Sequence, residues 1–77
     1  MGRIVIKEGT LGGKPIIDGT RISVELVLEM LSSGMTEKEI LKNYPNLKKE
    51  DIRACLEYAS KQLKNEDYFS TDKKVTA

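Results

Sequence analysis

Four basic side chains, Lys42, Lys48, Lys49 and Arg53, lie close together in the middle of the chain. Clustered Lys and Arg are the groups that contact nucleic-acid phosphates, and the planar guanidinium of an arginine can donate two hydrogen bonds to one guanine. We therefore take these four residues as candidate DNA contacts, with Arg53 as the candidate base reader. The alternative is a solvated helix surface, because the acidic residues Glu50 and Glu57 are interspersed among them.

A second basic pair, Lys14 and Arg21, lies in a glycine-rich segment nearer the N-terminus. The run Gly12-Gly13-Lys14-Pro15 is not a Walker loop, because that motif requires G-x-x-x-x-G-K-[ST] leading directly into a helix. The run is interpreted as a tight turn beside a strand, with Thr20 and Arg21 joining the hairpin to the next helix. In a second interpretation, Lys14 and Arg21 contact phosphate or a protein partner.

Composition excludes several kinds of chemistry. The chain of 77 residues has no histidine and a single cysteine, Cys55, which excludes Ser-His-Asp and Cys-His catalysis, zinc sites that use histidine, and an intramolecular disulfide. A chain of this length also buries too little surface to enclose a deep substrate cavity. We expect no enzymatic activity, no cofactor, no metal and no small-molecule substrate. The net charge of +1 is small for a DNA-binding protein.

The sequence patterns predict three parts of the chain, and the elements in these parts must position the candidate residues. Residues 1–22 contain short β-branched runs separated by glycines, which predict a β-hairpin region. Residues 23–63 have helical periodicity and predict a three-helix bundle, which with the hairpin forms a single domain over 1–63. Residues 64–77 are expected to be a polar C-terminal tail that carries Tyr68 and Phe69 as candidate partner-binding residues.

The three helices have clear boundaries in the sequence. The first is predicted over 23–33, followed by Gly34 as its terminating residue. The second begins at a T-x-x-E capping box formed by Thr36 and Glu39. The third begins near Lys48, with Asp51 as a carboxylate in its first turn. Its predicted apolar stripe, which includes the buried thiol, is Ile52, Cys55, Leu56, Ala59 and Leu63.

The stretches GGKPIIDGTRISVELVLEML, SSGMTEKEILKNYPNL and KKEDIRACLEYA resemble the prokaryotic family catalogued as domain of unknown function 433. The resemblance implies a mainly α fold with a short N-terminal β-hairpin and a three-helix helix-turn-helix of homeodomain-like or winged-helix-like type. It also implies a likeness to VapB-type antitoxins, which neutralise a PIN-like ribonuclease toxin and repress their own operon as dimers.

These observations lead to three hypotheses. The first is an antitoxin-like, homodimeric regulator that binds operator DNA through the third helix and neutralises a PIN-like toxin with its tail. The second is a protein-interaction or dimerisation module without DNA binding. The third is a nucleotide-handling enzyme built around Lys14 and Arg21. The chain has no membrane-span pattern and no signal-peptide pattern, so we expect a cytoplasmic protein.

Overall fold

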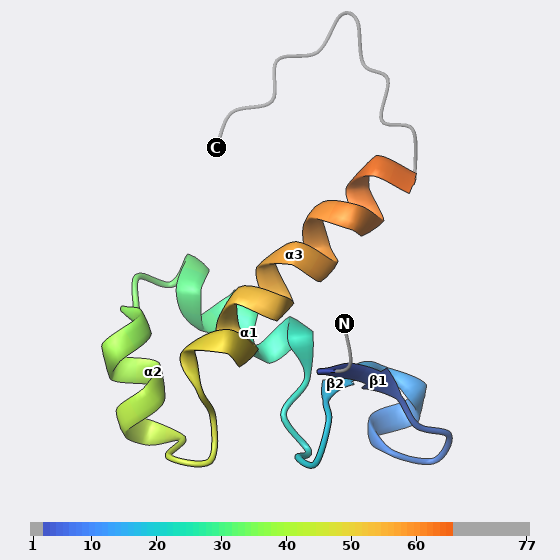
Figure 1. Ribbon diagram of the computed structural model, residues 1–77, viewed down its shortest axis with the longest axis horizontal. Helices are drawn as coiled ribbons and strands as arrows, with labels where there is room; N and C mark the ends of the chain where they lie inside the picture. The colour runs from blue at the N-terminus through green and yellow to red at the C-terminus, as the bar shows by residue number, and fades with distance from the viewer. Residues whose placement is uncertain (1–2, 66–77) are drawn as a thin grey trace, which may run out of the picture.

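A short hairpin precedes three helices in the computed structural model, which describes residues 3–65 (Figure 1). This confirms the predicted order of elements and the mainly α class. The elements in chain order are β1 (Ile4–Ile6), the 3-10 turn η1 (Leu11–Gly13), β2 (Pro15–Ile17), α1 (Val24–Ser32), α2 (Glu37–Asn43) and α3 (Lys49–Asn65).

The two strands pair antiparallel, with Val5 opposite Ile16 at the centre. The loop between them contains η1, in which Gly12 and Gly13 have φ angles of 67° and 79°. Glycine reaches this left-handed region without the penalty of a Cβ atom. The chain then enters β2 at Pro15, so the Gly-Gly-Lys-Pro run is a turn beside a strand, as predicted, and does not lead into a helix.

The connection from β2 to α1 is held by Thr20. Its hydroxyl donates a hydrogen bond to the Ile17 carbonyl at 2.7 Å and accepts one from the Ile22 N–H at 2.9 Å. The predicted role in joining the hairpin to the first helix is therefore confirmed for Thr20. Arg21 is exposed and makes no side-chain hydrogen bond to any residue in the described range 3–65.

The helix boundaries follow the predicted capping residues. The Ser23 hydroxyl accepts a hydrogen bond from the Leu26 N–H at the start of α1. Gly34, at φ 103°, follows the end of α1 in a left-handed conformation that favours glycine. At α2, the Thr36 side chain accepts from the Glu39 N–H while the Glu39 carboxylate accepts from the Thr36 N–H, which confirms the capping box.

The core lies where α1 and α2 pack against the first half of α3, with Ile17 from β2 completing it. Val27, Ile40 and Ile52 are at most 1% exposed and occupy the centre of this cluster. The remaining buried members of the cluster are Ile22, Val24, Met30, Leu47 and Cys55.

The second half of α3 departs from the sequence prediction. Leu56 and Leu63, which were expected on the buried stripe, are 50% and 55% exposed. The buried side of α3 instead follows Ile52 and Cys55, with Tyr58 partly buried, and the helix extends beyond the elements that could cover it (Figure 1). The last helix ends two residues after the predicted boundary at 63, because α3 continues through Lys64 to Asn65. The predicted partner-binding residues Tyr68 and Phe69 lie outside the described residues.

Candidate nucleic-acid interface

The connection between α2 and α3 positions the basic residues of the candidate interface. It spans residues 44–48, and Leu47 within it is 5% exposed, so a buried side chain fixes the connection to the core. The Leu47 N–H donates to the Tyr44 carbonyl at 2.9 Å, which closes a tight turn. A short helix, a fixed turn and a longer helix therefore follow one another.

Asp51 holds the first turn of α3 in place. Its carboxylate accepts a hydrogen bond from the Lys48 N–H at 2.9 Å, as expected for an acidic residue at this position. Its other oxygen accepts from the Arg3 guanidinium at 2.8 Å, and the Asp51 side chain is only 7% exposed. The hairpin is thereby joined to the start of α3 by a partly buried ion pair.

Sequence reasoning missed Arg3, because 48 positions separate it from Asp51 and no local pattern connects the two. The pair affects the electrostatics of the interface. An acidic side chain already occupies the positive end of the α3 dipole, and a cation from the hairpin neutralises that acid. Attraction of phosphate therefore depends on the exposed lysines and arginine.

All four candidate DNA contacts in this region, Lys42, Lys48, Lys49 and Arg53, are exposed. Lys49 and Arg53 are four residues apart in α3, so their side chains share one face of the helix. Glu57 lies one further turn along that face, but its carboxylate is 3.8 Å from the ammonium of Lys61. The first two turns of α3 consequently present a small basic face formed by Lys49 and Arg53, with the exposed Glu50 in the same turns.

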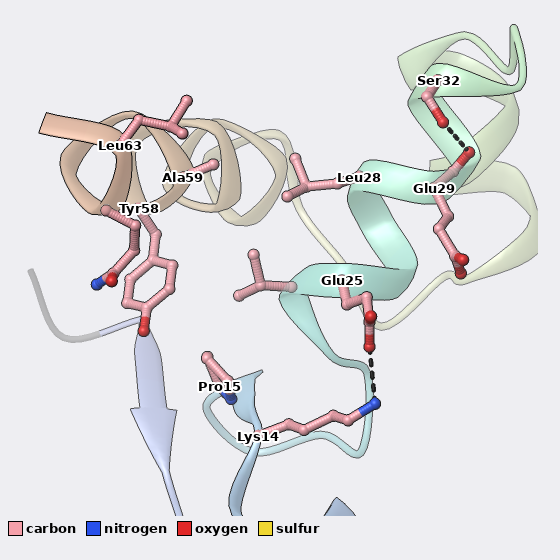
Figure 2. Close-up of a pocket in the computed structure, with 11 residues that line it drawn as sticks. Lys14, Pro15, Glu25, Leu28, Glu29, Ser32, Tyr58, Ala59 and Leu63 are labelled. Carbon is pink, nitrogen blue, oxygen red and sulfur yellow. Dashed lines mark hydrogen bonds and ion pairs between the residues drawn. The ribbon is translucent and has the colours of Figure 1, made fainter. Parts of the chain in front are cut away.

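The other two candidates are not part of this cluster. The Lys14 ammonium donates to the Glu25 carboxylate at 2.8 Å, and this hydrogen bond raises the pKa of Lys14 and lowers the pKa of Glu25 (Figure 2). Lys14 lines an open groove between α1 and the second half of α3, and its ammonium contacts α1. Arg21 is exposed in the loop before α1. Of the six candidates, Lys48, Lys49 and Arg53 lie at the start of α3, Lys42 lies in the last turn of α2, and Lys14 and Arg21 lie in other parts of the fold.

Two further features bear on the chemistry of the molecule. Cys55 is fully buried, and burial raises the pKa of its thiol to about 11, so at neutral pH it is a protonated core residue and not a nucleophile. Within residues 3–65, no group of three or more His, Cys, Asp or Glu side chains is placed to hold a metal ion. An open groove between α1 and the second half of α3, which the sequence did not predict, is the other notable surface (Figure 2).

Comparison with known families gives a direct match. The family described as "Protein of unknown function (DUF433)" matches residues 4–59. The chain belongs to the DUF433 family. The match extends from β1 into the second half of α3, so it includes the hairpin, the α2–α3 turn and the basic face of α3.

Among solved structures, the chain is similar to a DUF433 member protein from Anabaena variabilis ATCC 29413, with 35% sequence identity and a TM-score of 0.76. The alignment covers 84% of this chain and 64% of the DUF433 protein from Anabaena, so this chain corresponds to somewhat less than two thirds of that protein. No curated protein matches the chain. Within the described part of the chain, none of the helices is both long enough and apolar enough to cross a membrane.

Proposed function

We propose that this DUF433 protein is a small antitoxin-like regulator that binds operator DNA as a homodimer. The observation that carries the DNA half of the proposal is the pair Lys49 and Arg53, exposed on one face of the first turns of α3 and preceded by Lys48 in the α2–α3 turn. In helix-turn-helix proteins this part of the last helix enters the major groove.

Each basic residue has a distinct role in the proposal. Arg53 reads a base, since its guanidinium can form a bidentate contact with guanine. Lys42, Lys48 and Lys49 contact phosphates and orient the helix. Lys14 is left out, because its ammonium is already paired with Glu25. A dimer doubles the basic face, which compensates for the net charge of only +1.

The DNA proposal is tested by fluorescence anisotropy with a labelled fragment of the protein's own promoter. We expect affinity to fall steeply between about 50 and 200 mM salt, because binding releases counterions from the neutralised phosphates. Arg53→Ala should weaken specific binding by about 1–3 kcal/mol and relax the base preference at one position. The matched control is Lys61→Ala, which removes one positive charge from the same helix at a residue already paired with Glu57.

Two outcomes of the anisotropy experiment would contradict the proposal. Absence of binding at low salt refutes the DNA proposal. Equal losses for Arg53→Ala and Lys61→Ala would show that only net charge matters, and would refute base reading by Arg53.

Toxin neutralisation is the second half of the proposal, and the resemblance of the motifs to antitoxin-like members supports it. We expect the chain to form a complex with a PIN-like ribonuclease encoded beside it and to suppress its toxicity on co-expression. Tyr68 and Phe69 are the proposed anchors, because aromatic side chains dominate binding energy at protein interfaces. The double variant Tyr68→Ala/Phe69→Ala should lose neutralisation while keeping the helical content of the domain. Full neutralisation by this variant would refute the assignment to the tail.

The alternative function, a protein-interaction or dimerisation module without DNA binding, is favoured by one observation of its own. The groove between α1 and α3 is apolar and open to solvent, which is typical of a surface that accepts a protein segment. A protein that dimerises or captures the ribonuclease but shows no anisotropy change with DNA would establish this alternative.

A further inference from the structure

An open groove of about 730 Å³ runs between α1 and the second half of α3 (Figure 2). Val24 and Leu28 form its α1 side, while Tyr58, Ala59 and Leu63 form its α3 side. Lys14 and Pro15 close one end. The walls are mainly apolar and the groove is open to solvent, so it can accept an apolar ridge from another element.

Helix α3 itself carries such a ridge. Leu56 and Leu63 are at least half exposed and lie seven residues apart, with Ala59 between them. The spacing 56, 59, 63 is that of the a and d positions of a coiled coil, in which side chains of one helix insert between those of another. Single exposed leucines are ordinary, but Leu56 and Leu63 lie one heptad apart on one face of α3, and Leu63 also lines the groove, so we call Leu56, Ala59 and Leu63 the α3 seam. No element among residues 3–65 covers this seam.

Charge distinguishes the two sides of the groove. The α1 side carries Glu25 and Glu29, and the last turn of α1 contains no basic residue. The end of α3 carries Lys61 and Lys64, both exposed. Glu25 is already paired with Lys14, and Lys61 with Glu57, so the charge argument depends on Glu29 and Lys64. Within the described residues, Glu29 and Lys64 make no ion pair. Lys64 at the end of α3 in one chain is therefore opposite in charge to Glu29 on α1 of another chain.

We propose that the groove is occupied by α3 of a second copy of this chain, in a two-fold dimer. A two-fold interface uses one self-complementary patch on both protomers, and here a single patch supplies both the apolar ridge and the groove that receives it. Leu63 of each protomer inserts beside Leu28 of the other, and Lys64 pairs across the axis with the partner's Glu29. The proposal rests on the homodimer of the proposed function and names the surface that forms it.

Sedimentation velocity of the full chain without DNA tests this surface. We expect a species of twice the 8.6 kDa chain mass at micromolar concentration. Leu63→Glu should weaken the dimer by about tenfold or more, because it places a charge in an apolar contact. Leu11→Glu is the matched control, since Leu11 is also exposed but lies in η1, outside the groove lining. Circular dichroism checks that each variant keeps its helices.

A charge exchange tests the predicted cross-pairing. Glu29→Lys should weaken the dimer, and Glu29→Lys/Lys64→Glu should restore it, because the exchange recreates an opposite-charge pair across the axis. A wild-type chain that stays monomeric, a Leu63→Glu variant that still dimerises, or a double variant that does not recover would overturn the proposal. A monomer that dimerises only after truncation at Asn65 would also overturn it, and would identify residues 66–77 as the occupant.

These outcomes are independent of the DNA measurement. A dimer that uses this surface but does not bind the promoter would refute the DNA proposal alone. A monomer that binds the promoter would refute the proposed surface and leave DNA binding by α3 intact.

Discussion

The ion pair between Arg3 and Asp51 should be the most important single polar contact for the stability of the domain. The two side chains meet at 2.8 Å, and Asp51 is 7% exposed whereas Arg3 is 41% exposed. Replacing Arg3 with Met keeps most of the aliphatic stem but leaves the Asp51 carboxylate with only the Lys48 N–H as a partner. A buried charged group that loses its partner destabilises the folded state.

The expected magnitude follows from these exposures. A hydrogen bond between charged groups contributes about 1.5–3 kcal/mol, and screening by solvent around the partly exposed Arg3 reduces this to about 1–2 kcal/mol. In a domain of this size each kcal/mol lowers the midpoint of thermal unfolding by about 4–8 °C. Urea unfolding followed by circular dichroism at constant pH gives the free energy of unfolding directly.

The chain offers a matched control for this prediction. Lys7 and Asp18 also form an ion pair, but their nitrogen and oxygen are 3.9 Å apart and both side chains are more than half exposed. Lys7→Met should therefore change the free energy of unfolding by less than about 0.5 kcal/mol. If Arg3→Met and Lys7→Met have equal effects, the reasoning from burial is wrong. In an Asp51→Asn background the Arg3→Met effect should shrink, because the charge that Arg3 compensates is gone.

Three other predictions concern the cap of α2 and the buried thiol. Thr36→Ala removes the acceptor for the Glu39 N–H at the start of α2 and should lower the free energy of unfolding by about 0.5–2 kcal/mol, measured by urea unfolding; an unchanged value would contradict the capping box. Cys55 should react with a thiol reagent at neutral pH only after denaturation, because it is fully buried and its pKa is raised to about 11. Since the folded thiol holds its proton more tightly than the unfolded one, Cys55 should make stability fall as pH rises above about 9. Rapid labelling of the native protein, or stability that does not fall over this range in comparison with Cys55→Ala, would argue against a buried neutral thiol.

The order of elements and most helix boundaries could be predicted from the sequence, because they depend on contacts between residues close in the chain. Thr36 and Glu39 are three residues apart and fix the start of α2 in any context that permits a helix. Glycine at 34 and at 12–13 marks positions where the backbone turns into a left-handed conformation. The kinds of chemistry that the chain cannot perform could also be predicted from the sequence, since the absence of histidine does not depend on folding.

The candidate interface was predictable only in part. Lys49 and Arg53 are four residues apart, so helical periodicity placed them on one face of the last helix. Periodicity could not show that the Lys14 ammonium is paired with Glu25 of α1.

Local sequence patterns predicted where the helices start and which residue types are available for chemistry. The packing of the folded chain selects which apolar side chains are covered. Leu56 and Ile52 are one turn apart on α3, yet Ile52 is buried in the core cluster and Leu56, which is not part of that cluster, is half exposed. Likewise Asp51 was recognisable as a capping residue, but its partner Arg3 comes from the hairpin, 48 positions away. Burial and long-range pairing are properties of the packed chain, and both the stability prediction and the proposed dimer surface depend on them.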